Sequence, residues 1–355
     1  MVEDGPYLVF GANGVIGRYD KFNHEESELL ITCRGATCGS VNVSEPKSWI
    51  TGNAMVVRSR NGSIDRRFLE YLFRGGIDVS KAITGAAQPQ ITRTNLEPLE
   101  ISYPNNLAEQ QRIVGILDEA FEGIARAKAN AEKNLQNARA LFESHLQSVF
   151  THRGDGWVEK SLADIAQVKG GKRVPKGYKL LNEPTDYPYL RVADFNDTGT
   201  IEMSDLRYVS AKIHSEIKNY VIYSTDLYMS IAGTIGKTGI IPEDLDGANL
   251  TENACRLVFN PGVNNRFVYY FTVTPDFVEQ AGLNTRTAAQ PKLALSRLST
   301  IKLGIPPLPE QKRLAAKFDA LREETQRLAS LYTRKLAALE GLKKSLLHQA
   351  FSGEL

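Results

Sequence analysis

A stretch in the middle of the chain recurs at its end, and this duplication constrains the fold more than any single motif. Residues 85–150 begin with Gly-Ala-Ala-Gln-Pro-Gln, and residues 287–351 begin with Thr-Ala-Ala-Gln-Pro-Lys. Each copy then passes a proline and a Glu-Gln pair and continues as a long helical pattern. The copies lie about 200 residues apart, far beyond the roughly 20–50 residues of a solenoid repeat. We therefore expect one large module built twice, which suits a target with two halves.

The composition is that of an ordinary globular protein without a strong global charge. Of 355 residues, 42% are hydrophobic and 24% are charged, and the formal net charge is +2. Any nucleic-acid surface must therefore come from local basic clusters. Cys33 and Cys38 have no second Cys or His pair nearby, and Cys255 is isolated, so we expect reduced thiols, no metal and a cytoplasmic location. No apolar run approaches the ~20 residues of a membrane span.

Two segments without internal proline, 107–150 and 310–355, carry a helical pattern, and we expect the second helix to begin at 309. Apolar residues recur there at three- and four-residue spacing. About 40 helical residues reach roughly 60 Å, and an apolar seam of that length needs a partner helix. We expect the two helices to pair as a coiled coil, although each could instead pack on its own globular domain. The predicted pairing residues are Ile113, Leu117, Ile124, Leu135, Leu141, Leu314, Phe318, Leu321, Leu328, Leu339 and Leu342.

The segments before the helices, 1–106 and 151–308, have a sequence pattern typical of strands and turns. Short β-type runs such as Leu29-Leu-Ile-Thr32 and Ala254-Cys-Arg-Leu-Val-Phe259 alternate with Gly, Asn, Asp and Pro. The predicted fold is therefore α+β, with two mixed α/β domains separated by the two long helices. The chain order is globular, helix, globular, helix.

One motif near the start favours a different class of protein. Gly11, Gly14 and Gly17 follow the apolar run Tyr7-Leu-Val-Phe10, as in the strand–turn–helix that binds a dinucleotide. The residues after Gly17 show no apolar helical face, and no alternating strand–helix order follows. An NAD(P)-dependent oxidoreductase using Gly11–Gly17 stays a remote alternative.

The second module carries a series of short motifs in a fixed order. They are Trp157-Val-Glu-Lys-x-Leu162-Ala-Asp-Ile165, Lys169-Gly-Gly-Lys-Arg173, Gly233-Thr-Ile-Gly-Lys237, Gln290-Pro-Lys292, Ile305-Pro-Pro-Leu-Pro-Glu-Gln311 and Leu346-Leu-His-Gln-Ala-Phe-Ser-Gly353-Glu-Leu. In these motifs the chain resembles the specificity (S) subunits of type I restriction–modification systems. Each motif alone is weak, but their order and spacing, with a partial second copy, make the match specific over residues 5–355.

This resemblance implies a DNA-recognition scaffold without catalytic residues. Two target recognition domains, 1–106 and 151–308, would each read one half of a gapped site in double-stranded DNA. The helices would pair antiparallel, act as a ruler between the half-sites and dock two methyltransferase subunits, with restriction subunits joining indirectly. The chain itself would bind no cofactor, because S-adenosylmethionine and ATP with magnesium are used by the partner subunits. No membrane is involved.

Candidate DNA contacts are polar and basic side chains beside glycines or in loops, where Arg suits guanine and Gln or Asn suits adenine. The alternative for any one of them is a solvated or turn-stabilising residue. In the first module they are Asn13, Arg18, Arg34, Gln88, Gln90 and Arg93. In the second module they are Lys169, Lys172, Arg173, Lys176, Arg191, Asn196, Lys237, Arg286, Thr287, Gln290 and Lys292.

The first module departs from the pattern, because nothing in it matches residues 157–186. We expect an N-terminally truncated first recognition domain, whose folding and DNA reading the sequence leaves open. A decayed subunit that only docks its partners is therefore a second alternative. The bases recognised, and whether a restriction subunit accompanies the methyltransferase, do not follow from the sequence.

Overall fold

The computed structural model describes residues 4–85, 87–282 and 293–355. The chain divides into two compact units, and each unit contains a part of each long helix. Unit 1 comprises Met1–Leu135 and Leu331–Leu355, and unit 2 comprises Gln136–Ser330.

Unit 1 carries two small sheets and a short helix that packs on the long helix α3 (Leu107–Thr151). The sheets have the strand orders β2-β1-β5 and β4-β3-β6. The strands are β1 (Tyr7–Gly11), β2 (Gly14–Tyr19), β3 (Leu29–Thr32), β4 (Val41–Val43), β5 (Trp49–Ile50) and β6 (Ala54–Val57). The short helices are α1 (Arg66–Tyr71), the π-helical turn η1 (Leu72–Gly76), the 3-10 turn η2 (Val79–Ala82) and α2 (Arg93–Leu96).

Unit 2 repeats this plan with additional strands. Its sheets have the orders β10-β9-β14-β11, β13-β12-β15-β8 and β16-β7. The strands are β7 (Val158–Ser161), β8 (Ala166–Gly170), β9 (Pro188–Leu190), β10 (Arg207–Tyr208), β11 (Val221–Ile222), β12 (Leu227–Ser230), β13 (Thr238–Gly239), β14 (Ala248–Leu250), β15 (Ala254–Phe259) and β16 (Lys302–Ile305). The helices are α4 (Leu162–Ile165), α5 (Ala211–Ile217), α6 (Asn265–Thr272), α7 (Pro275–Gln280) and α8 (Leu295–Ser299), and the 3-10 turns are η3 (Val192–Asp194), η4 (Lys218–Tyr220) and η5 (Glu243–Leu245).

Equivalent hydrogen bonds form within each of the two units. In unit 1 the Thr51 N–H donates to the Phe10 carbonyl, and in unit 2 the Thr251 N–H donates to the Leu190 carbonyl. The strands concerned run parallel in both units, β1 with β5 and β9 with β14. The duplication inferred for the helical segments therefore extends into the sheets.

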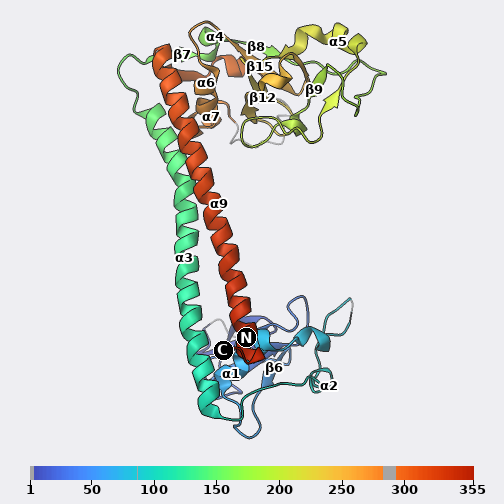
Figure 1. The fold of residues 1–355 in the computed structure, drawn as a ribbon, viewed down its shortest axis with the longest axis vertical. Coiled ribbons are helices and arrows are strands. Elements are labelled where there is room, and N and C mark those ends of the chain that lie inside the picture. Colours follow the sequence, from blue (N-terminus) through green and yellow to red (C-terminus); the bar gives the residue numbers. More distant parts are fainter. Residues whose placement is uncertain (1–3, 86, 283–292) are drawn as a thin grey trace. The chain divides into compact units, whose positions relative to one another are not determined.

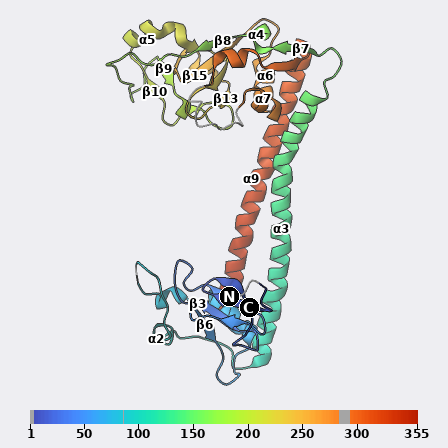
Figure 2. The same ribbon diagram turned by 180° about the vertical axis from the view of Figure 1, so that it is seen from behind.

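The long helices α3 (Leu107–Thr151) and α9 (Leu308–Ser352) run antiparallel within each unit, side by side in both views (Figures 1 and 2). In unit 1 the Lys128 ammonium donates to a Glu340 carboxylate oxygen at 2.7 Å. In unit 2 the ring of Phe150 stacks on that of Phe318 with centroids 6.0 Å apart. The predicted α+β class and the pairing of the helices are confirmed, and the alternative of separately packed helices is excluded within each unit.

The helix seam differs from the predicted one in part. Four predicted pairing residues are buried: Ile113, Leu117, Leu314 and Phe318. Five more are half-buried: Ile124, Leu135, Leu321, Leu328 and Leu339.

The expectation for Leu141 and Leu342 was wrong, because their side chains are 52% and 48% exposed. Small residues occupy the buried positions along the middle of the helices instead, with Ala131, Ala138 and Thr325 all at 6% exposure or less. Small side chains at such positions let two helix backbones approach closely.

The segment with the glycine motif is a hairpin. β1 and β2 pair antiparallel, with Gly11 opposite Gly14. A dinucleotide site requires a helix N-terminus after the glycines, and here Gly14–Tyr19 is a strand. The oxidoreductase alternative is therefore wrong at this segment.

Candidate functional site

Each sheet-bearing part is fastened to a long helix by a buried glutamine. The Gln110 carboxamide accepts from the Asp65 N–H at 2.7 Å and donates to the carbonyls of Ser63 and Pro104. These bonds tie the turn before α1, the residues before α3 and α3 itself together. Because Gln110 is fully buried, its three bonds satisfy polar groups that water cannot reach.

Gln311 makes the same bonds in unit 2. It accepts from the Asn264 N–H at 2.8 Å and donates to the carbonyls of Gly262 and Pro306. The Glu-Gln pairs of the repeat thus have a physical role, because the glutamine joins helix to domain. The glutamates pair with arginines one turn later, Glu109 with Arg112 and Glu310 with Arg313. Asn106 caps α3 by accepting from the Ala108 N–H.

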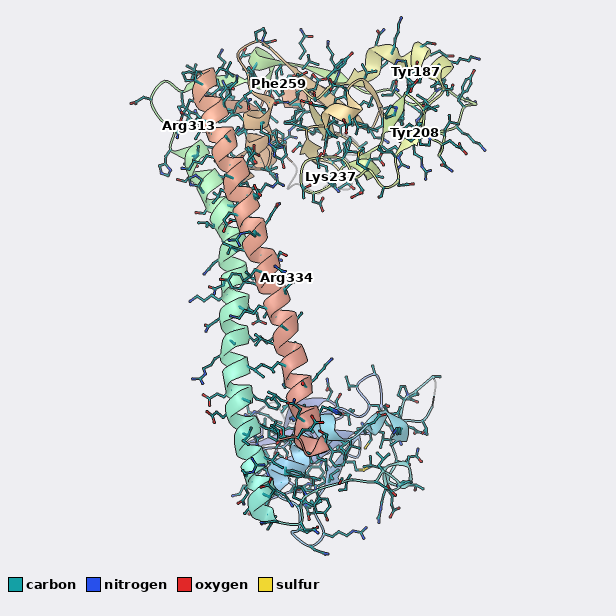
Figure 3. All side chains as sticks on the ribbon, viewed as in Figure 1. Tyr187, Tyr208, Lys237, Phe259, Arg313 and Arg334 are labelled. Carbon is teal, nitrogen blue, oxygen red and sulfur yellow. The ribbon has the colours of Figure 1, made fainter. Side chains whose placement is uncertain are left out.

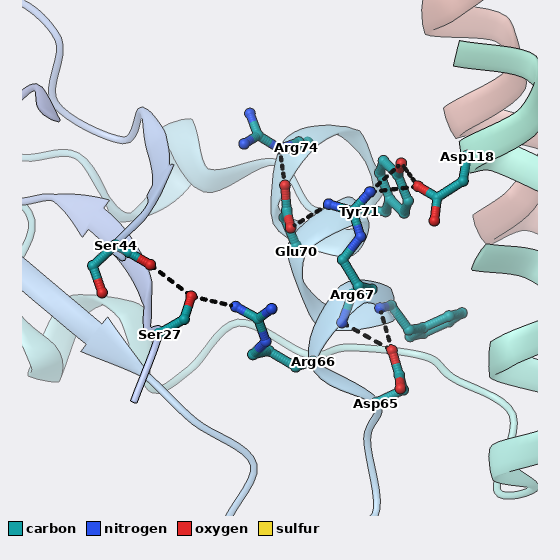
Figure 4. Close-up of polar contacts among 10 residues, drawn as sticks. Ser27, Ser44, Asp65, Arg66, Arg67, Glu70, Tyr71, Arg74 and Asp118 are labelled. Atoms are coloured by element: carbon teal, nitrogen blue, oxygen red, sulfur yellow. Dashed lines mark hydrogen bonds and ion pairs between the residues drawn. The ribbon is translucent and has the colours of Figure 1, made fainter. Parts of the chain in front are cut away.

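A second fastening in unit 1 joins α1 to α3 through three side chains. Figure 4 shows Arg67 and Tyr71 of α1 pointing toward the Asp118 carboxylate of α3. The Arg67 guanidinium also lies over the Tyr71 ring at 5.1 Å. Burial, followed by the bond to Asp118, raises the pKa of the Tyr71 phenol, so it stays protonated and donates to the carboxylate.

Unit 2 repeats this cluster between α6 and α9. Arg266 donates to the Asp319 carboxylate at 2.8 Å, and the Tyr270 hydroxyl donates to the same oxygen. The Arg266 guanidinium lies 5.5 Å from the Tyr270 ring centroid. Burial and the bond to Asp319 likewise raise the pKa of the Tyr270 phenol. We call the two sets, Arg67–Tyr71–Asp118 and Arg266–Tyr270–Asp319, the domain anchors.

The domain anchors were missed at the sequence level, although a signal was present. Residues 67–71 read Arg-Phe-Leu-Glu-Tyr and residues 266–270 read Arg-Phe-Val-Tyr-Tyr, which is one Arg-Phe-x-x-Tyr pattern written twice. The four-residue spacing places Arg and Tyr on one face of a helix. The phenylalanine between them is fully buried in both units, Phe68 at 1% and Phe267 at 0% exposure.

In unit 1 most of the predicted DNA contacts gather around the end of β3. Arg34 and Gln90 form an isolated antiparallel bridge, and the Gly35 N–H donates to the Pro89 carbonyl at 3.0 Å. The Thr32 hydroxyl donates to the Ala12 carbonyl, which brings the β1–β2 turn beside the same loop. Within this region the exposed residues are Asn13, Arg34, Gln88, Gln90 and Arg93.

Arg18 stands apart from that group. Its guanidinium donates to the carbonyls of Gly5 at 3.0 Å and Pro6 at 3.3 Å. The geometry gives it a role in holding the start of β1 against β2. No hydrogen bond or ion pair of the described residues links it to the loop of Arg34.

In unit 2 the exposed cations lie at the end of β8 and just after it. Lys169 and Lys176 are exposed and form no ion pair within the part of the chain that the structure describes. Lys172 lies over the Tyr220 ring at 5.6 Å. Arg173 is 78% exposed and pairs with Glu252, whose pKa is lowered by that bond in spite of the opposing effect of its burial. These four residues supply local positive charge in a chain of low net charge.

Three other candidates in unit 2, Arg191, Asn196 and Lys237, form hydrogen bonds or ion pairs with other residues of the fold. Arg191 is held by Asp194 and Asp205 and is largely buried. Asn196 accepts from the backbone N–H groups of Thr198 and Thr200 at 3.0 Å each, which makes it a turn-stabilising residue.

Lys237, labelled in Figure 3, donates to the Phe195 carbonyl and pairs with Asp197, both at 2.9 Å. The geometry favours structural roles for it, Arg191 and Asn196. The remaining candidates, Arg286, Thr287, Gln290 and Lys292, lie outside the described residues.

The described residues offer no site for a metal, since no group of three or more His, Cys, Asp or Glu side chains comes together among them. The thiols of Cys33 and Cys38 have raised pKa values, chiefly through burial, as inert thiols do. Among the described residues no helix combines the length and apolarity that crossing a membrane requires.

Comparison with known families identifies the family of the chain. The family model described as the type I restriction modification DNA specificity domain matches residues 3–134 and again residues 154–333. The chain belongs to this family. The double match follows the two modules seen in the sequence and in the domain anchors, so each half of the chain is one copy of a DNA specificity domain.

The relatives of this family member are specificity subunits. The EcoBI specificity subunit of Escherichia coli is 21% identical, and the match covers 92% of this chain and 73% of the relative. A putative specificity subunit of Haemophilus influenzae, S.HindORF215P, is 24% identical over 88% of this chain and 79% of the relative.

Solved structures share the fold. The HsdS subunit from Thermoanaerobacter tengcongensis is similar with a TM-score of 0.64 at 17% identity, covering 98% of this chain and 91% of that one. A chain from a study of complex assembly in a type I R-M system reaches a TM-score of 0.72 at 18% identity, covering 94% and 83%.

Proposed function

We propose that this chain is the DNA-recognition subunit of a type I restriction–modification complex and reads a gapped, two-part site. The observation that carries the proposal is that both specificity domains are attached to a long helix in the same way. Each attachment consists of a buried glutamine and an Arg–Tyr–Asp domain anchor at equivalent positions of the two units. A protein that needs two readers at fixed positions requires two equally rigid attachments.

The proposed DNA-contacting surfaces are the exposed polar and basic residues of each unit, which lie in loops, at the end of β8 and at the start of α2. In unit 1 they are Asn13, Arg34, Gln88, Gln90 and Arg93. In unit 2 they are Lys169, Lys172, Arg173 and Lys176, with Arg286, Thr287, Gln290 and Lys292 proposed from the sequence alone. Lysines and arginines would neutralise phosphates and supply most of the affinity, while amides and arginines would read base edges.

Catalysis belongs to other subunits in this proposal. Two methyltransferase subunits would dock on the long helices and use S-adenosylmethionine, and restriction subunits would use ATP and magnesium. The chain would act in the cytoplasm, where the DNA is. The EcoBI relative is itself named as the specificity subunit of a type I restriction enzyme, which supports this division of labour.

The test is to express the chain with its methyltransferase partner in cells that lack other DNA methylation and to sequence the methylated bases. We expect a motif of two short parts separated by a fixed gap. A complex that assembles but methylates no motif would contradict DNA reading and favour the alternative of a scaffold that only docks partners.

A triple substitution tests the surface of unit 2. Replacing Lys169, Lys172 and Lys176 by alanine should weaken DNA binding and reduce its dependence on salt concentration, because each lost phosphate contact lowers the salt slope by about one. A matched control replaces Lys312, Lys317 and Lys335 of α9, which keeps the net charge equal. Equal losses in both variants would count against this surface.

A further inference from the structure

The two units differ along one sheet edge. In unit 2, β15 is paired on both sides, by β12 and by β8. In unit 1 the equivalent strand β6 pairs with β3, and no strand covers its other edge within the described residues. An open edge presents unpaired N–H and carbonyl groups to any extended peptide.

A cavity lies beside the open edge of β6. It has a volume of about 390 Å³ and is lined by apolar residues of β6, α1, α2 and the segment after α2, together with three arginines. Its apolar lining includes Val57, Leu69, Leu96, Leu99 and Ile101. Ile101 is 37% exposed, and Val57, Leu96 and Leu99 are half-buried. Apolar surface of this kind is normally covered.

In unit 2 the residues equivalent to the cavity lining of unit 1 are covered by other parts of the chain. Leu257, Val268, Leu298, Ile301 and Leu303 take the places of the five lining residues and are all at 2% exposure or less. They belong to one core that also holds the α4 side chains Leu162 and Ile165.

The chain around α4 is also bound through its backbone. The Leu162 N–H donates to the Ile301 carbonyl at 2.8 Å, and β8 then runs antiparallel to β15 with Val168 opposite Leu257. The cover over this part of unit 2 is thus a strand, one helical turn and a second strand.

We propose that the edge of β6 and the adjoining cavity bind a segment of a separate polypeptide that has the chemistry of residues 157–171. The segment would add an antiparallel strand to β6 and place one leucine and one isoleucine, three residues apart on a single helical turn, into the cavity. Backbone hydrogen bonds would give affinity, and the two apolar side chains would give selectivity. Arg58 is already paired with Glu28. Arg60 and Arg93 also line the cavity and form no ion pair among the described residues, so they favour a segment with an acidic residue near the turn, as Asp164 is in unit 2.

The test uses a synthetic peptide of residues 156–171 and the full chain, with hydrogen exchange of the protein as the readout. We expect the peptide to slow exchange in residues 54–59 and 96–103 and to leave β15 unchanged. The control peptide carries Leu162→Asp and Ile165→Asp and should have no effect. The protein variant Ile101→Asp, altered at an exposed position, should lose the response.

A tethered version removes weak affinity as an explanation for a negative result. The same segment is joined ahead of Asp4 through a flexible linker of about 16 residues, which raises its effective concentration to the millimolar range. Slower exchange in residues 54–59 of the tethered chain supports the proposal. Unchanged exchange there, or an equal effect of the doubly substituted segment, overturns it. Protection of residues 54–59 that rises with protein concentration without peptide would assign the edge to a second copy and also overturn it.

Discussion

Single side chains fix the recognition domains to the helices, and the duplication provides matched variants. Tyr71→Phe and Tyr270→Phe each remove one hydroxyl that donates to an anchor carboxylate. We expect each to destabilise its own attachment by about 1 kcal/mol, the ordinary net worth of such a bond. Hydrogen exchange should quicken in α1 for Tyr71→Phe and in α6 for Tyr270→Phe. The unaltered unit is the internal control, and faster exchange in both units from either change would contradict separate anchors.

The folding stability of the protein should depend on pH through His145. Its pKa is lowered from the ordinary 6.5 by burial and by Lys317, its Nε2 atom finds no hydrogen-bond partner among the described residues, and its ring contacts Phe318. Below pH 6.5 the unfolded chain gains a proton that the folded chain resists, so folding stability falls as pH falls through this range. The repeat places Leu346 at the equivalent position.

The variant His145→Leu should therefore be more stable than the parent at pH 5 and similar to it at pH 8. Melting temperatures of both proteins between these values provide the measurement. A stability difference that stays constant with pH would show that His145 does not titrate between the folded and unfolded states.

The sequence predicted which charged side chains are exposed better than it predicted which of them already have partners in the fold. Cations such as Lys169 and Lys176 were predicted to be exposed from local pattern alone, and they are exposed, Lys169 at the end of β8 and Lys176 after it. Arg191 and Lys237 looked equivalent in sequence, but their partners Asp205 and Phe195 come from loops whose position depends on the fold. Local pattern identifies a charge, and only tertiary structure tells whether that charge is already used.

At the scale of elements, helix periodicity located α3 and α9 but not the faces that meet. The large residues of the apolar stripe were expected in the seam, yet Ala138 is buried and Leu141 is exposed. Hydrophobic size does not decide which residues face a partner helix, because close approach requires small ones. Among the described residues the strand β8 has no counterpart beside β6, so unit 1 also departs from the sheet that the repeat alone would suggest.

This gives a prediction for the seam. Ala138→Leu should overpack the helix pair and destabilise it by about 1–3 kcal/mol. Leu141→Ala, only three residues away and 52% exposed, should change stability by about 0.5 kcal/mol or less. Helical circular dichroism during thermal unfolding compares the two. A larger effect at Leu141 would mean that the helices pair through a different face.

In the molecule as a whole, the duplicated glutamines and domain anchors and the two continuous helices are the features that matter for reading a two-part site. Each 45-residue helix has residues in both units. The sequence predicted this organisation because a duplication survives as pattern over long distances. It could not predict the Arg–Tyr–Asp anchors as contacts, since their members lie about 50 residues apart.

We expect the helix pair to act as a ruler for the gap in the recognised site. Removing residues 133–136 of α3 and 331–334 of α9 takes one turn from each helix, shortens the pair by about 6 Å and rotates its ends by about 40°. One base pair contributes about 3.4 Å and, at 10–10.5 base pairs per turn, about 35°. The gap in the methylated motif should therefore shrink by one or two base pairs while both half-site sequences stay the same. The control replaces the same eight residues by alanine without shortening, and it should keep the original gap. If the shortened protein methylates a motif with the parent's gap, the distance between the half-sites is set by something other than the helices.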